Sequence, residues 1–198
     1  MMTFIWAGLG VLALMTVLWL ISIYLTNVSI VDNFWGIGFV LVALIYGLEC
    51  EVLYTRTKLM MFLVTVWGLR LSIYLMYRNY GKGEDYRYRE FRRSYGAHRY
   101  WWFSFFQVFM LQGGLILIIS LPLLGIALKT NSNALNLFDY LGLLVWSIGL
   151  IFESVGDYQL ASFKPVSYTH LTLPTMIIRC RSRWGGVEGK GGGGGGGG

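Results

Sequence analysis

Residues 3–25 read TFIWAGLGVLALMTVLWLISIYL, a stretch of 23 residues without one charged side chain. A helix needs about 20 mostly apolar residues to cross the hydrocarbon core of a membrane. No basic segment precedes the stretch and no small-residue cleavage site follows it, so it does not resemble a signal peptide. It therefore predicts a membrane-spanning helix over residues 3–26.

Four further apolar stretches follow, separated by short polar loops. They predict helices over residues 34–54, 59–77, 103–128 and 138–163. The second is apolar only to Leu48, and we expect it to continue through Glu49 to Tyr54. No run of alternating apolar and polar residues indicates a barrel strand. The predicted fold class is all-α, a polytopic transmembrane bundle of about five helices.

The composition also favours lipid as the solvent. The 198 residues are 56% hydrophobic and only 13% charged, whereas about a quarter of the residues of a soluble domain are charged. The formal net charge of +6 would suit nucleic acid, but seven of the 16 basic residues lie in one loop between apolar stretches. We therefore expect membrane lipid, and no nucleic acid, as a partner. The two cysteines, Cys50 and Cys180, have no metal-ligand spacing, and no metal site is predicted.

The basic residues of the short loops predict the orientation, because Lys and Arg are enriched in cytoplasmic loops. The loop of residues 78–100 carries seven of them, against Arg56 and Lys58 in the loop after the second helix and Lys129 in the loop after the fourth. The loop of residues 78–100 is thus predicted to be cytoplasmic and the N-terminus to lie outside. Asp32 and the end of the fifth helix then share the cytoplasmic face.

The end of the chain has a different character. Residues 165–198 contain eleven glycines, and the last eight residues are all glycine. Such a segment cannot offset the backbone entropy that is lost when it orders. The string VSYTHLTLPT at residues 166–175 resembles translated sequencing-adapter read-through. We therefore divide the chain into a membrane domain of residues 1–164 and a non-native or disordered tail of residues 165–198.

Three ionisable residues lie inside predicted membrane helices, where a charge is costly and usually functional. Arg70 lies in the third helix, and Glu153 and Asp157 lie four residues apart on one face of the fifth. Arg70 could instead reach the interface or pair with Glu153 for packing alone. Asp157 lies close enough to the predicted interface to be simply solvated.

Two polar sites lie at the predicted cytoplasmic face. Asp32 stands just before the second apolar stretch, where it could cap a helix or act as an acid on a bound substrate. The loop that begins at Arg78 and contains Lys82 mixes cations with Gly81 and Gly83. These cations could bind phosphate oxygens, or the loop could merely touch lipid headgroups.

Several short strings, in their order along the chain, resemble the bacterial steroid 5-alpha-reductase-like membrane family. The resemblance covers Met1 to Lys164 and is specific for the family, not for a substrate. The strings are SIVD at residues 29–32, FWG at 34–36, WGLRL at 67–71, GKGEDYRY at 81–88, LQG at 111–113 and FE at 152–153.

This resemblance implies a reductase in a bacterial inner membrane that transfers hydride from NADPH to a polarised carbon–carbon double bond. The substrate would be lipid-like, of steroid or isoprenoid type. Asp32 corresponds to the acidic residue that polarises the substrate carbonyl, and it is the predicted catalytic residue. The predicted cofactor-binding residues are Arg70, Arg78, Lys82, Glu153 and Asp157.

Two features depart from the family pattern. Trp67 stands where the steroid enzymes have a tyrosine, and an indole cannot donate a phenolic proton. Beyond Lys164 the family continues with a segment that encloses the cofactor, and no matching segment is found here. We therefore expect an N-terminal fragment that is itself inactive.

Two alternative functions remain open from the sequence. One is a relative of the membrane methyltransferases that use S-adenosylmethionine. The other is a non-catalytic membrane protein whose basic loop binds lipid. Binding of NADPH or of S-adenosylmethionine would distinguish these alternatives. The substrate and the oligomeric state do not follow from the sequence.

Overall fold

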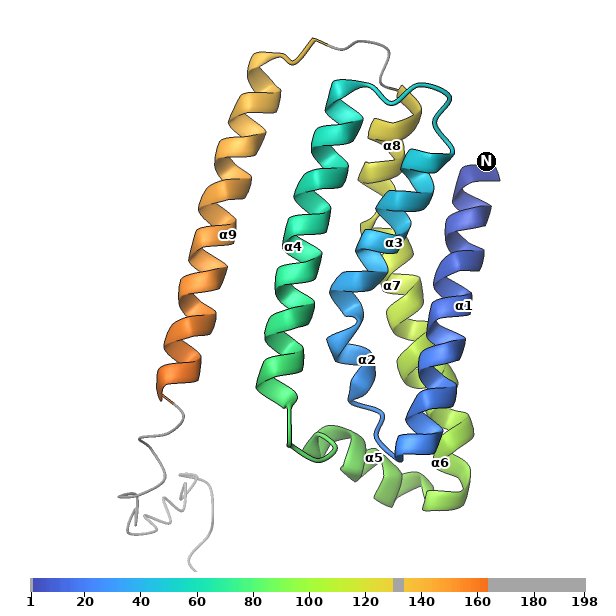
Figure 1. The fold of residues 1–198 in the computed structure, drawn as a ribbon. Coiled ribbons are helices and arrows are strands. Elements are labelled where there is room, and N and C mark those ends of the chain that lie inside the picture. The colour runs from blue at the N-terminus through green and yellow to red at the C-terminus, as the bar shows by residue number, and fades with distance from the viewer. Residues whose placement is uncertain (1, 130–133, 164–198) are drawn as a thin grey trace, which may run out of the picture. The chain divides into compact units, whose positions relative to one another are not determined.

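The structure, a computed structural model, describes residues 2–129 and 134–163, apart from the side chains of residues 97, 98 and 163. These residues form helices and no strands (Figure 1). The contacts discussed below lie within one compact unit, residues 1–158. The helices are α1 (Met2–Leu25), α2 (Ile30–Asn33), α3 (Trp35–Leu48), α4 (Thr55–Asn79), α5 (Tyr86–Tyr95), α6 (Ala97–Ser104), the π-helix η1 (Phe105–Met110), α7 (Leu111–Ile119), α8 (Leu121–Lys129) and α9 (Leu137–Phe163).

Four helical stretches in the described residues are long and apolar enough to cross a membrane. They are Met2–Leu25, Thr55–Asn79, Arg99–Lys129 and Leu137–Ser162. Their outward side chains are large and apolar: Leu9 and Val17 of α1, for example, are 49% and 53% exposed. Lipid tails can cover such side chains. The prediction of an all-α membrane bundle is thus confirmed, and the predicted tail of residues 165–198 lies outside the described residues.

The second predicted helix is shorter than expected. α3 ends at Leu48, and the expected continuation through Glu49 to Tyr54 is wrong, because residues 50–54 form a bend and a loop. Glu49 and Glu51 are the first charged residues after the apolar stretch, and carboxylates are costly within hydrocarbon. α3 is therefore an apolar helix of 14 residues, shorter than the four spans.

The fourth predicted helix is interrupted rather than regular. It consists of α6, η1, α7 and α8, which follow one another from Ala97 to Lys129. Pro122 has no backbone N–H, and it lies in the first turn of α8, where that N–H is not needed. The break before α8 thus has a sequence cause. A π-helix such as η1 shifts the register of the side chains that follow it, and π-helices are frequent at functional sites.

α3 is the centre of the packing and contacts both α1 and α4. Tyr46 of α3, Met15 of α1 and Phe109 of η1 are among the fully buried side chains of the core. Gly36 at the start of α3 lies against Gly68 of α4, so closely that a Cβ atom on Gly68 would lie 2.6 Å from the carbonyl oxygen of Gly36. This contact brings the α2–α3 junction against α4.

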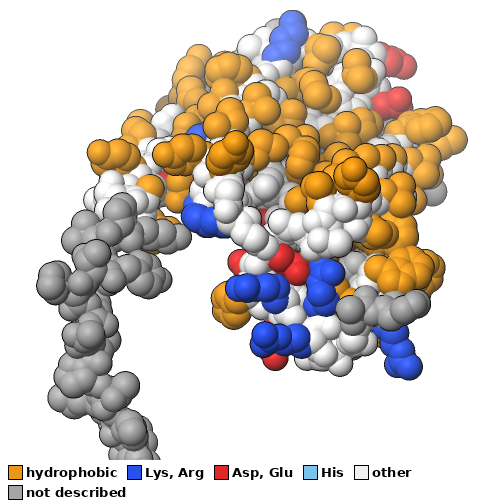
Figure 2. Space-filling model, turned by 60° about the horizontal axis from the view of Figure 1, so that its bottom comes forward, with side chains coloured by type: hydrophobic (Ala, Val, Ile, Leu, Met, Phe, Trp, Pro, Cys, Tyr) orange, Lys and Arg blue, Asp and Glu red, His pale blue; other side chains and the backbone are white. Residues whose placement is uncertain are grey.

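α5 was not predicted, because residues 78–100 were expected to form a loop. It lies across the ends of α1 and α4 at the bottom of Figure 1, beside α6. Asp85 caps its first turn by accepting a hydrogen bond from the backbone N–H of Arg87. Figure 2 views this end of the bundle, where charged side chains gather below the apolar side chains of the helices. We call it the α5 end.

Candidate functional site

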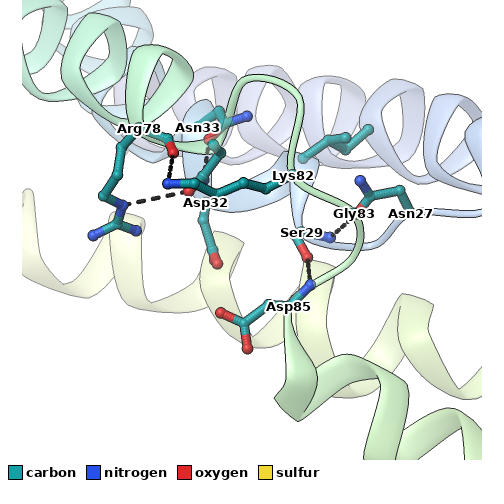
Figure 3. A pocket seen from close by; sticks show the side chains of 10 residues that line it. Asn27, Ser29, Asp32, Asn33, Arg78, Lys82, Gly83 and Asp85 are labelled. Carbon is teal, nitrogen blue, oxygen red and sulfur yellow. Dashed lines mark hydrogen bonds between the residues drawn. The ribbon is translucent and has the colours of Figure 1, made fainter. Parts of the chain in front are cut away.

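A pocket of about 140 Å³ lies at the α5 end, between the short helix α2 and the loop that follows α4 (Figure 3). α2 provides Asp32 and Asn33 to its wall, and the end of α4 and the loop provide Arg78 and Lys82. Ser29, just before α2, completes the wall on the side of Asp85. Three of the predicted site residues, Asp32, Arg78 and Lys82, therefore line one pocket.

Two hydrogen bonds and one ion pair, from residues of α5 and α7, converge on the carboxylate of Asp32. The Tyr88 hydroxyl of α5 donates to Oδ1 over 3.1 Å, and Nε2 of Gln112 in α7 donates to the same oxygen over 3.1 Å. The guanidinium of Arg87 lies 3.6 Å from Oδ2. Asp32 lies inside α2 rather than at a helix N-cap, since Ser29 precedes α2 and Phe34 precedes α3. The capping interpretation of Asp32 is therefore wrong.

The cations of the pocket are held by the end of α4. Nε of Arg78 donates to the Asn79 side chain over 3.3 Å, and Asn79 donates to the Asn33 side chain over 2.8 Å. The Lys82 ammonium donates to the carbonyl oxygen of Arg78. These contacts join α4 to Asn33 of α2, next to Asp32 in the sequence, and both cations lie in the wall of the same pocket as Asp32 (Figure 3).

Two acidic residues fix the loop before α5. Glu84 is largely buried and accepts hydrogen bonds from the backbone of Val28 over 3.0 Å and from Arg92 over 2.8 Å. The backbone N–H of Asp85 donates to the Ser29 hydroxyl over 2.7 Å. The loop and α5 are thus attached to the segment before α2, which explains how Tyr88 reaches Asp32.

The environment shifts the pKa of two groups around the pocket. Burial and the adjacent Asp32 carboxylate raise the pKa of the Tyr88 phenol well above its usual range, so Tyr88 keeps its proton and remains a donor. Burial opposes ionisation of Asp85, but hydrogen bonds from Arg87 outweigh this effect and lower the pKa of Asp85. Asp85 is therefore an anion at neutral pH.

The other three predicted site residues form a second cluster, between α4 and α9. The Arg70 guanidinium lies 2.8 Å from a carboxylate oxygen of Glu153 and 2.8 Å from one of Asp157. The Trp67 indole N–H donates to Glu153 over 3.0 Å, and the Tyr74 hydroxyl donates to the backbone carbonyl of Asp157 over 3.3 Å. Arg70 thus pairs with both carboxylates.

The two clusters lie near each other along α4, and Tyr74 contacts a residue of each. Among the described residues, no hydrogen bond or ion pair joins Arg70, Glu153 or Asp157 to the pocket around Asp32. Tyr74 lies between them, since the Arg78 guanidinium lies over its ring at 5.9 Å and its hydroxyl reaches Asp157. The six predicted site residues therefore divide between two clusters in the structure.

Sequence reasoning gave no role to Tyr88 or Gln112. Tyr88 lies in the basic loop, and only the folding of α5 directs it toward Asp32. Gln112 carried a signal, because an amide in an apolar membrane stretch usually has a polar partner. In the residues that the structure describes, no group of three or more His, Cys, Asp or Glu side chains could hold a metal ion.

The chain resembles known proteins over most of its length. The family described as "Protein of unknown function (DUF1295)" matches residues 18–172. The uncharacterized protein C594.04c of Schizosaccharomyces pombe is 32% identical over 149 residues, which cover 72% of this chain and 43% of that protein. The chain therefore spans less than half the length of that relative. No solved structure gives a significant match.

The family match covers a different range of residues from the resemblance that was predicted from the sequence. The family match begins at residue 18 and includes residues 165–172, whereas the expected resemblance ended at Lys164. The relative comes from a fungus, so a bacterial origin stays a prediction, as does the adapter interpretation of the tail.

Proposed function

Because this chain belongs to the DUF1295 family, within the steroid 5-alpha-reductase-like superfamily, we propose that it functions in a membrane-embedded, NADPH-dependent reductase. The substrate would carry a polarised carbon–carbon double bond in a lipid-like skeleton of steroid or isoprenoid type. The observation that carries the proposal is the contact of Asp32 with the buried phenol of Tyr88, beside the cations Arg78 and Lys82.

The contact between Asp32 and Tyr88 suits the chemistry at the substrate carbonyl. The oxygen of an enone gains negative charge as hydride reaches the β carbon, so a donor near that oxygen stabilises the transition state more than the ground state. Tyr88 retains its proton and donates it to Asp32, whose carboxylate is also held by Gln112. On this proposal the enone oxygen would replace Asp32 as the acceptor of the Tyr88 proton. Tyr88 would supply the phenolic donor that Trp67 cannot supply, because an indole has no hydroxyl group.

The cations Arg78 and Lys82 fit a phosphate group of NADPH. When bound, NADPH would supply the hydride. Guanidinium and ammonium groups form strong, charge-assisted hydrogen bonds to phosphate. The pocket of about 140 Å³ is smaller than the roughly 300–1,000 Å³ of typical ligand sites, so it accommodates only one part of the dinucleotide. We place the α5 end on the cytoplasmic side, because the basic loop lies there.

Arg70, Glu153 and Asp157 are proposed as the neighbouring part of the cofactor site. Tyr74 connects this cluster to Arg78, and Arg70 is only partly exposed. On this proposal the nucleotide competes with the carboxylates for Arg70, so cofactor binding and the attachment of α9 are coupled.

Cofactor binding by the purified chain in lipid nanodiscs tests the proposal. NADPH fluorescence should report binding, and Arg78→Gln or Lys82→Gln should weaken it roughly 10- to 100-fold, as expected for the loss of one hydrogen bond to a charged group. Lys58→Gln is the matched control, because it removes a lysine charge at the opposite end of α4. Binding of S-adenosylmethionine alone would overturn the reductase proposal.

A lipid-like enone tests the donor pair separately. A hydrogen bond to the enone oxygen shifts its absorption band to longer wavelength, and Tyr88→Phe should abolish that shift while NADPH binding is retained. Turnover should be assayed with the longer Schizosaccharomyces pombe relative, given NADPH and the enone lipid. Absence of NADPH oxidation there, together with no shift here, would contradict the proposed reaction.

A further inference from the structure

A second hollow of about 220 Å³ lies at the α5 end, where the end of α1 meets α5 and α6. Ser22 and Thr26 line it from α1 and the turn that follows, Arg92 from α5, and Tyr100 and Ser104 from α6. It shares no lining residue with the pocket around Asp32. The proposed reductase chemistry therefore does not account for it.

Two donors in this hollow have no partner among the residues that the structure describes. The Tyr100 side chain is 1% exposed, and its hydroxyl is unpaired. Nε of Arg92 is also buried and unpaired, although Nη2 of the same guanidinium donates to the Thr26 carbonyl and to Glu84. A buried donor without a partner costs about 1–3 kcal/mol. Two such donors in one hollow indicate a ligand with acceptor atoms.

The relative placement of these donors is fixed by packing. The Arg92 guanidinium lies over the Tyr100 ring, 5.3 Å from its centroid. The hydroxyls of Ser22 and Ser104 already donate to the backbone carbonyls of Trp19 and Trp101. Each serine hydroxyl has one proton, which it already donates, so Tyr100 and Arg92 are the donors available to an acceptor in the hollow.

The surroundings specify the kind of acceptor. α5 carries four arginines and one glutamate, so the field at this end is positive (Figure 2). The adjacent Trp101 and Trp102 are 45% and 52% exposed, and exposed tryptophans mark the level of the lipid headgroups. Ile23, on the rim of the hollow, is exposed and apolar. Arg92, the one charged residue among the described residues that line the hollow, is paired with Glu84, so the positive field comes from the other arginines of α5. A hollow with two unpaired donors, an apolar rim and a position at headgroup depth fits a phosphate group attached to acyl chains.

We propose that the hollow binds the phosphate group of a membrane phospholipid. Tyr100 donates its hydroxyl proton to one phosphate oxygen and Arg92 donates Nε–H to another, while the acyl chains lie along Ile23 and the outer face of α1. The inference does not depend on the reductase proposal, because the two sites use different side chains.

Tyr100→Phe is the discriminating variant, because it removes one oxygen atom and leaves the packing of the ring unchanged. Phosphatidylglycerol bound to the purified chain is measured by native mass spectrometry and by the shift in melting temperature that it causes. We expect affinity to fall about tenfold or more in Tyr100→Phe, with the lipid-induced melting shift largely lost. Tyr80→Phe, at a tyrosine that is 89% exposed, is the matched control and should behave as the parent chain.

Two further probes identify the source of the phosphate. A diacylglycerol with the same acyl chains should bind weakly, because it lacks the phosphate group, and inorganic phosphate alone should not stabilise the chain at millimolar concentration. Equal binding of diacylglycerol, stabilisation by inorganic phosphate without lipid binding, or unchanged lipid affinity in Tyr100→Phe would each overturn the proposal. If Tyr100 had only a structural role, Tyr100→Phe would leave the lipid affinity unchanged, and the stability of the chain would stay equal or rise.

Discussion

α4 contacts α3 and α9 by different means. Its contact with α3 is close and contains Gly36 and Gly68, whose backbones touch. Its contact with α9 is made by polar groups, and none of the described side chains of α9 is buried. The ion pairs are those of Arg56 with Asp139 and of Arg70 with Glu153 and Asp157, and Trp67 and Tyr74 add hydrogen bonds. Apolar surface gains little from helix association in lipid, so interfaces depend on close van der Waals packing or on polar contacts. In this chain α4 packs closely against α3 and makes polar contacts with α9.

Gly68→Val should have the largest effect, because it breaks the first kind of interface. The new Cβ would lie 2.6 Å from the Gly36 oxygen and 2.8 Å from a Val40 methyl carbon. Backbone cannot yield as a side chain can, so we expect α3 and α4 to separate and stability to fall by about 1–3 kcal/mol or more. The melting temperature and the yield of monodisperse protein in detergent measure this loss of stability.

Gly114→Val is the control for this substitution. It places the same side chain in the interior of another helix, where a Cβ would meet no atom within 4 Å. Equal losses of stability in Gly68→Val and Gly114→Val would show that the cost comes from helix propensity. The close packing of α3 on α4 would then not be what stabilises the chain at Gly68.

Arg70→Met should have an intermediate effect, because it breaks the second kind of interface. Two carboxylates lose their cation within the membrane, and α9 should loosen while the α3–α4 contact persists. Because Glu153 is 40% exposed, we expect a cost of roughly 1–2 kcal/mol, less than for a fully buried pair. Hydrogen exchange in nanodiscs should accelerate in α9 and stay unchanged in α3.

Arg56→Met sharpens this prediction at the other end of α4. Arg56 contacts a single carboxylate and is 33% exposed, so water replaces the lost contact more readily. Its effect on α9 should be smaller than that of Arg70→Met. A larger effect of Arg56→Met than of Arg70→Met would mean that the Arg56–Asp139 pair, rather than the Arg70 cluster, holds α9 against α4.

The smallest effect is expected outside both interfaces, at the N-cap of α5. The pKa of Asp85 is lowered below its ordinary value of 3.8 in the folded chain, so the stability that its charge contributes is present above that value. It is lost as pH falls below 3.8 through the folded pKa. α5 should therefore fray in acid, as measured by hydrogen exchange corrected for its intrinsic pH dependence. Asp85→Asn keeps the cap but should remove the contribution of Asp85 to this pH dependence, and an unchanged profile would contradict it.

The sequence predicted the helices better than their contacts. Length and lack of charge along one segment determine whether it can cross a membrane, and these are local properties that remain after folding. The C-terminal end of α3 was mispredicted, because the helix was expected to continue past Leu48 although the apolar stretch ends there. α5 was missed because its polar, arginine-rich sequence has the composition of a loop and is ordered by Glu84, Asp85 and their distant partners.

The candidate site could be predicted only as a set of residue types. Asp32, Arg70, Arg78, Lys82, Glu153 and Asp157 stand out in the sequence, because charge near or within lipid is costly. Their division into two clusters depends on the path of α4 past α2 and α9. Tyr88 and Gln112 reach Asp32 from positions 56 and 80 residues away, a convergence that no local pattern encodes.

By itself the sequence determined the solvent of this protein, since apolar segments of membrane length cannot be hidden in a soluble core of this size. Only the tertiary structure decided which charges pair, which donors remain unpaired at Tyr100 and Arg92, and where two glycines bring helices together. The physical reason is distance: hydropathy is summed along the chain, whereas hydrogen bonds and ion pairs need atoms within about 3–4 Å of one another in space.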